Sequence, residues 1–290
     1  MSKYYYLVAG LPNIALDDSK LTYTITDFRR ELDGVLSAED KRLIDLFFLK
    51  FDNQNLLTQL AWPDREGDMR GSITNEELQD LIKIVREDDT LPANSLIPPY
   101  FVDFLRLYSG SDNQEETLST ISWEDRLATL YYAYAMKNSN EFVASWFEFN
   151  LNINNILTAY TCRKYGLDKA DYIIGDNEIA EAIRTSNARD FGLGDTLDYL
   201  PALQRIAEES NLMVREKKID LLKWEWLEEN TFFKPFDIES VFAYLLKLEM
   251  IERWLTLDST TGEETFRRIV GAMKKGSQNI LEEFKRNNNK

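Results

Sequence analysis

The chain has 290 residues, of which 44% are hydrophobic and 12% aromatic, so it carries enough apolar side chain for one large core or two smaller ones. Glycine and proline are scarce, at 12 and 7 residues, and this scarcity favours helices over all-β folds, which need many turn residues. The formal net charge of −16 disfavours nucleic acid and anionic lipid as partners, and it is typical either of a chain with a basic protein partner or of simple solubility.

Histidine is absent and cysteine occurs once, at Cys162. The absence of histidine removes the commonest general base and the commonest metal ligand. Cys162 follows an apolar run, which favours a buried structural thiol over a nucleophile. No run of about 18 apolar residues occurs, so we expect a cytoplasmic protein without direct membrane insertion.

Helix starts can be read in chain order from capping residues that precede apolar residues at helical spacing. Ser37 and Ser122 each precede such a run, and Thr74 with Glu77 has the pattern of a capping box. A long helix is predicted from Glu141 to Tyr165, because its apolar periodicity continues until a glycine follows.

The second half of the chain is predicted to be helical as well. The helices predicted there are a short one capped by Asp176, a pair at about 196–229 that join near Asn211, one from Asp237 to about Leu257, and two at 263–274 and 278–285. Residues 232–236 are interpreted as a buried aromatic connector. No stretch alternates like a long strand, so the expected fold class is all-α.

A polar pair recurs on three of the predicted long helices, at spacings of 100 and 97 residues. Each pair has an acid or amide at positions i and i+3, with large apolar residues before and after it. Residues at this spacing share a helix face, where polar groups beside core residues can hydrogen-bond a neighbouring helix and fix its register. The pairs are Asp52 and Asn55, Asn152 and Asn155, and Glu249 and Glu252.

A glycine and then a short helix follow each polar pair at a similar distance. The glycines stand in Gly71-Ser72, Gly175-Asp176 and Gly276-Ser277. The repeated unit is a long helix with a polar pair, a loop ending in glycine, and a short helix; the alternative is coincidence in a helix-rich chain. The predicted units, which form one continuous structural domain, are residues 1–112, 113–210 and 211–290.

This pattern resembles the C-type central-stalk family of V-type and archaeal-type rotary ATPases, whose eukaryotic members are known by the letter d. The long helices of that family carry an acid or amide followed three residues later by Asn and then Leu or Ile, as the first two pairs do; the third has Glu in place of Asn. The opening Tyr4-Tyr5-Tyr6-Leu7-Val8-Ala9-Gly10 is similar to the family's aromatic start. The segments that resemble a divergent bacterial branch, encoded beside V-type ATPase subunits, are 187–193, 216–220 and 253–254.

The resemblance implies a function without chemistry. Members of this central-stalk family are funnel-like bundles of three related helical units that link the membrane proteolipid ring to the D/F shaft and transmit torque between them. On this interpretation the chain has no catalytic, cofactor-binding or metal-binding residue and is peripheral on the membrane through the complex. We further expect acidic and polar side chains on helix ends and loops around a central hollow to contact the shaft, since the net charge is −16 and the repeated helices carry polar pairs.

Two alternatives remain at this point. One is a helical-repeat adaptor of another cytosolic assembly. The other is a metal-dependent all-α enzyme, which needs carboxylates that converge from two helices. The acid pairs Asp17-Asp18 and Asp88-Asp89 are interpreted as solvated helix ends, and no GxxxxGK[ST] phosphate-binding loop is present.

Overall fold

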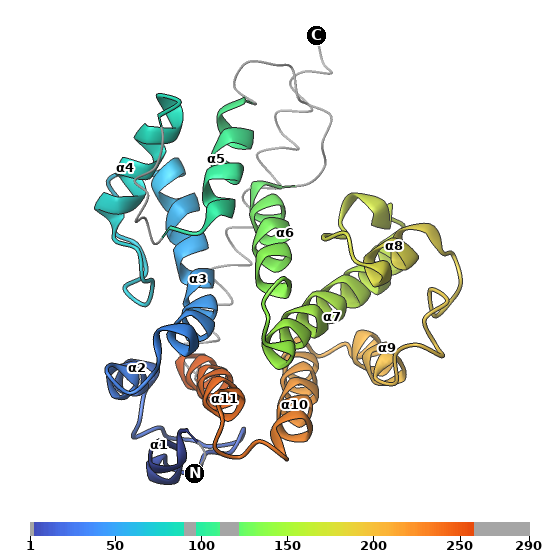
Figure 1. The fold of residues 1–290 in the computed structure, drawn as a ribbon. Coiled ribbons are helices and arrows are strands. Elements are labelled where there is room, and N and C mark those ends of the chain that lie inside the picture. Colours follow the sequence, from blue (N-terminus) through green and yellow to red (C-terminus); the bar gives the residue numbers. More distant parts are fainter. Residues whose placement is uncertain (1–2, 90–96, 111–121, 258–290) are drawn as a thin grey trace.

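The structure, a computed structural model, describes residues 3–89, 97–110 and 122–257 (Figure 1). These ranges contain eleven α-helices, one short 3₁₀ helix and no strand, so the predicted all-α class is confirmed for them. None of these helices combines the length and the apolar character needed to cross a bilayer. The helices predicted at 263–274 and 278–285, and the third glycine at Gly276, lie outside the described residues.

The helices differ in length, and three of those with 19 or more residues carry the predicted polar pairs. Their bounds are α1 Tyr5–Gly10, α2 Ile25–Leu32, α3 Ala38–Ala61, α4 Asn75–Arg86, α5 Pro99–Gly110, α6 Trp123–Met136, α7 Glu141–Tyr165, α8 Glu178–Thr185, α9 Leu200–Glu208, α10 Leu212–Thr231 and α11 Ile238–Thr256.

Side-chain capping begins the helices where the sequence predicted it. The hydroxyls of Ser37 and Ser122 accept hydrogen bonds from backbone N–H groups three residues later. Thr74 and Glu77 form the predicted capping box at the start of α4. These caps satisfy N–H groups that have no partner within the helix, which is why the starts were readable.

The predicted ends of the longest helix and the join between α9 and α10 are also confirmed. α7 runs from Glu141 to Tyr165 and ends at Gly166, whose φ of 68° is a left-handed conformation that favours glycine. Asn211 caps α10 by accepting hydrogen bonds from two backbone N–H groups. One cap was misplaced by a residue: Asn177, and not Asp176, caps α8.

The connector at residues 232–236 is not buried, which corrects the sequence prediction. Phe232 and Phe233 are 74% and 90% exposed. They lie in the connection where the chain leaves α10 and reverses into α11 (Figure 1). Only Phe236 of this segment packs inward, with its ring 4.7 Å from that of Tyr5 in α1.

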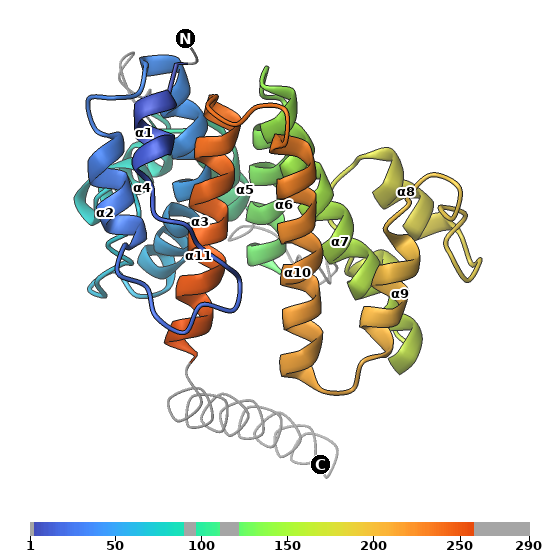
Figure 2. The same cartoon turned by 90° about the horizontal axis from the view of Figure 1, so that it is seen from below.

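Four helices enclose the centre of the molecule. Both α6 and α11 contact α3 and α7, so these two helices bridge the two longest ones. α10 packs alongside α11 (Figures 1 and 2) and is the fifth helix that lines the enclosed space. The helices that sequence reasoning missed, α1, α2 and α5, lie outside this ring of helices.

Aromatic side chains fill the contact between α7 and α10. Trp226 stacks on Phe149 with ring centroids 5.1 Å apart and on Phe142 at 5.5 Å. Trp224, two residues earlier, is 7% exposed on another face of α10. Both tryptophans of α10 therefore contribute to packing, and such ring contacts add stability beyond the area they bury.

Candidate functional site

The first polar pair fixes a loop onto α3. Asp52 Oδ1 accepts hydrogen bonds from the backbone N–H groups of Ser72 and Ile73, at 2.7 and 3.0 Å. Asn55 accepts from the N–H of Asp68 at 2.6 Å and donates to the carbonyl of the same residue at 3.0 Å. Both side chains are buried, so the pair replaces water as the partner of the loop that leads into α4.

The second pair makes a comparable arrangement on α7. Asn155 accepts from the N–H of Ile174 at 3.1 Å and donates to its carbonyl at 2.8 Å. Asn152 Oδ1 accepts from the side-chain amide of Asn177, the residue that caps α8, at 2.9 Å. Each pair therefore holds the loop that precedes the next short helix.

The third pair lies on α11 and its two members point to different helices. Glu252 accepts a hydrogen bond from the N–H of Ile25, the first residue of α2, at 2.6 Å. Glu249 forms an ion pair with Lys50 of α3 at 2.8 Å. The structure therefore does not gather the three pairs into one site, and only Glu249 faces the central space.

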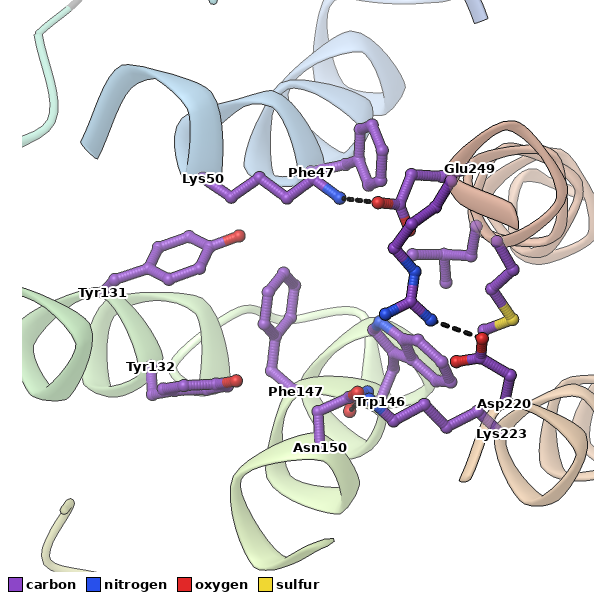
Figure 3. A pocket seen from close by; sticks show the side chains of 13 residues that line it. Phe47, Lys50, Tyr131, Tyr132, Trp146, Phe147, Asn150, Asp220, Lys223 and Glu249 are labelled. Carbon is purple, nitrogen blue, oxygen red and sulfur yellow. Dashed lines mark hydrogen bonds and ion pairs between the residues drawn. The ribbon is translucent and has the colours of Figure 1, made fainter. Parts of the chain in front are cut away.

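That central space is a cavity of about 230 Å³, lined by side chains from five helices (Figure 3). It is bounded by aromatic rings of α3, α6 and α7 on one side and by charged groups of α10 and α11 on the other. The lining residues are Phe47, Lys50, Tyr131, Tyr132, Trp146, Phe147, Asn150, Asp220, Lys223, Leu246, Glu249, Met250 and Arg253.

An ion pair between the half-buried Arg253 and a buried carboxylate closes one end of this cavity. Arg253 donates to Asp220, which is 2% exposed, and the indole N–H of Trp254 donates to the same carboxylate at 2.6 Å. Asp220 therefore receives a charge-assisted and a neutral hydrogen bond, which is what a buried carboxylate requires.

Lys223 differs from the other charged groups at the cavity. It extends from α10 toward Asn150 (Figure 3), and no hydrogen bond or ion pair of its ammonium group is present among the described residues. Burial lowers the pKa of Lys223, as it does for Lys50, because loss of water disfavours the charged form.

A second cavity of about 510 Å³ lies on the far side of Asp220, Lys223 and Arg253, between α7 and α10. It adds Arg215 and Glu216 to the charged groups, and we call the two cavities together the central hollow. Its other lining residues are Asn154, Leu157, Thr158, Thr161, Cys162, Leu167, Tyr172 and Ile219.

The lining of the central hollow is not acidic, in contrast to the chain as a whole. Four basic residues and three acidic ones line it, although the whole chain carries 16 more acids than bases. The basic residues are Lys50, Arg215, Lys223 and Arg253, and the acidic ones are Glu216, Asp220 and Glu249. The acidic excess of the chain therefore lies elsewhere.

Sequence reasoning missed the lysines of the hollow, although a signal was present. Lys223 lies four residues after Ile219 and four before Leu227, both of which are buried. A residue at this spacing shares the apolar face of its helix, so its position alone places it toward the interior. Cys162 is buried as expected, and burial raises the pKa of its thiol.

Within the described ranges, no three Asp, Glu or Cys side chains are grouped to hold a metal ion. Comparison with known proteins matches residues 1–277 to a family model described as "Protein of unknown function (DUF2764)". No curated protein and no solved structure matches the chain.

Proposed function

The chain belongs to the DUF2764 family across residues 1–277, and from this premise we propose that it is a non-catalytic coupling component of a V-type rotary ATPase. In this proposal the protein links the membrane proteolipid ring to the D/F shaft and transmits torque between them. It is cytoplasmic and bound to the membrane through the complex, and the three related helical units form a funnel.

One observation carries the proposal: the repeated anchoring of a loop by a polar pair on a long helix. Asn55 and Asn155 each exchange two hydrogen bonds with the backbone of a single loop residue. This is the position at which the sequence resembles the C-type central-stalk family. A side chain that serves the same structural purpose 100 residues apart supports descent of the first two units from one ancestor.

The mechanical demands of coupling fit the same contacts. Any protein that transmits torque has to keep its helices and loops in a fixed relation under load. Buried side-chain amides that hold backbone groups do this, because breaking them leaves polar groups without partners. The ion pair between Lys50 and Glu249 ties α3 to α11 in addition.

The exposed aromatic residues indicate a contact surface at one end of the molecule. Phe232 and Phe233 lie in the turn between α10 and α11, and Tyr6, 80% exposed, lies on the neighbouring helix α1 (Figure 1). Exposed large apolar groups that gather at one place mark interfaces with other proteins. In the proposed complex this end faces the proteolipid ring, and in a helical adaptor of another assembly it faces a different partner.

Copurification tests the proposal. The full chain, tagged, is coexpressed with the D and F shaft proteins and the proteolipid of the same organism, and affinity-purified complexes are separated by size. We expect a stable complex with D and F, whose association rate, measured by surface plasmon resonance, falls as salt rises.

A variant of unchanged charge tests whether the exposed aromatic residues bind the ring. A variant with Phe232→Ser and Phe233→Ser keeps the charge of the protein and is expected to retain the shaft while losing the ring. If folded protein binds neither the shaft nor the ring at any salt concentration, the coupling function is wrong and the adaptor function takes its place.

A further inference from the structure

Three donor groups around the second cavity of the central hollow lack acceptors. Arg215 Nε and Arg253 Nε are buried without a hydrogen-bond partner. The ammonium group of Lys223, which lines the same cavity, also has no hydrogen bond or ion pair among the described residues. Buried donors are nearly always satisfied in folded proteins, so the two buried guanidinium N–H groups, beside a lysine without a hydrogen bond, require an explanation.

The acidic residues of the hollow cannot balance all of its cations, because two of the three already have partners. Asp220 accepts from Arg253 and Trp254, and Glu249 pairs with Lys50. With four cations and three anions around the hollow, one positive charge has no counter-charge. Neither Lys223 nor Arg215 forms an ion pair among the described residues, and Glu216 is the one acid of the hollow left to balance these two cations.

We propose that this cavity is an oxyanion-binding site, in which Lys223, Arg215 and Arg253 hold a carboxylate or phosphate group. An ammonium supplies three donors from one point charge, and a guanidinium supplies a planar set that matches two oxygens. The cavity, at about 510 Å³, is large enough for a phosphate or a small dicarboxylate. Thr158 and Asn154 of α7 line the same cavity and offer further neutral donors.

The oxyanion can come from two sources with the same chemistry: a free anion, or an acidic side chain of a protein that docks at the hollow. This site stands independently of the proposed coupling function, because it rests only on the contacts within the chain. A small anion and an acidic peptide, titrated separately, distinguish the two sources.

Titration calorimetry on the full chain at low ionic strength tests the site, with sodium phosphate, sodium succinate and a glutamate-rich peptide as separate titrants. The decisive variant is Lys223→Met, which removes a side chain without a partner among the described residues. The matched control is Lys20→Met, because Lys20 is exposed and the change in charge is the same. Arg215→Gln is a second variant that keeps the site testable if Lys223→Met fails to fold.

We expect one saturable site for at least one titrant, weakened about tenfold or more by Lys223→Met or Arg215→Gln and less than about twofold by Lys20→Met. Binding of phosphate or succinate alone assigns the site to a free anion, and binding of the peptide alone assigns it to a partner's acidic group. The proposal is overturned if no titrant binds, or if the variants bind as tightly as the wild type.

Discussion

Asn55 and Asn155, one on α3 and one on α7, form the same pair of hydrogen bonds with the backbone of a loop residue. In both cases the amide oxygen accepts from the loop N–H and the amide nitrogen donates to the carbonyl of the same residue. The loop backbone is thereby paired as it is in a β-ladder, although no second strand is present there. Two long helices therefore hold the loops that follow them through the same pair of hydrogen bonds.

Replacing either amide should destabilise the protein by a similar amount. Asn55→Ala and Asn155→Ala each leave a buried N–H and a buried carbonyl without a partner, so we expect a loss of about 1–3 kcal/mol in the free energy of unfolding. Urea denaturation measures it. Gln54→Ala is the control, because Gln54 is exposed on the same helix and should change stability by less than about 0.5 kcal/mol. Equal stability of all variants would mean that the loops are not held by these amides.

The close approach of the first loop to α3 depends on Gly71. A Cβ atom at Gly71 would lie 2.5 Å from Asp52 Oδ1 and 2.7 Å from Asn55 Nδ2. Gly71→Ala should therefore push the loop away from the polar pair and cost about 1–3 kcal/mol. Gly10→Ala is the matched control, because nothing lies within 4 Å of its Cβ position. Thermal unfolding of both variants distinguishes the two, and an unchanged melting temperature for Gly71→Ala would contradict the close packing.

Asp52 links stability to pH. Burial raises its pKa to about 6, and its Oδ2 has no hydrogen-bond partner. Since the unfolded carboxyl titrates at about pH 3.9, the folded chain binds more protons than the unfolded chain between about pH 4 and 6. The contribution of Asp52 to the free energy of unfolding therefore falls as the pH rises through that window.

Asp52→Asn should remove this dependence, because the amide oxygen still accepts from the loop and no charge is buried. Asn152 occupies the corresponding position on α7, which supports the exchange. At pH 7 we expect the variant to be more stable by about 1–3 kcal/mol, with a smaller slope between about pH 4 and 6. Urea denaturation across this range measures both, beside Asp80→Asn as a control at an exposed carboxylate. Lower stability of Asp52→Asn at pH 7 would show that the charged form is preferred.

Local signals were readable from the sequence, whereas contacts between distant segments were not. The ends of α7 and the join at Asn211 follow from glycine and capping chemistry that neighbouring residues determine. The bond from Ile25 to Glu252 joins residues 227 apart in the chain, and no local pattern predicts it. The exposure of Phe233 was missed for a related reason, since apolar character alone does not show that a turn projects from the fold.

In the candidate site, too, the features set by local spacing were predictable and those formed by distant helices were not. The polar pairs were found from their spacing. The first two pairs hold loops, whereas the third pair contacts the neighbouring helices α2 and α3 as expected. The central hollow depends on five helices that meet from separate parts of the chain, so its basic lining could not be derived from the net charge. Of its lining residues, Glu249 was singled out by its spacing, and Lys223 could have been found from its spacing to Ile219 and Leu227.

The exposed turn should matter for binding and not for folding. Phe232→Ser with Phe233→Ser removes side chains that are mostly in water, so the free energy of unfolding should change by less than about 0.5 kcal/mol. If the proposed complex forms, the variant should bind a detergent-solubilised proteolipid ring at least about tenfold more weakly, because exposed aromatic anchors dominate interface energies. Tyr165→Ser is the control, because Tyr165 is a 67% exposed aromatic residue at the end of α7 and not in the turn between α10 and α11. Equal ring binding by both variants would move the interface to another face.

Two cations on the central hollow should respond to removal in opposite directions. Lys223 has no hydrogen bond or ion pair among the described residues, so Lys223→Met removes a partly buried charge that no carboxylate contacts directly and should stabilise the ligand-free protein by about 1–2 kcal/mol. Arg253→Met instead leaves the buried carboxylate of Asp220 without its cation and should destabilise the protein by about 1–3 kcal/mol. Urea denaturation in chloride buffer without phosphate or carboxylates measures both, with Lys20→Met as the exposed control. A loss of stability in Lys223→Met as large as that in Arg253→Met would mean that the lysine already has a partner, and a central surplus of positive charge would then be wrong.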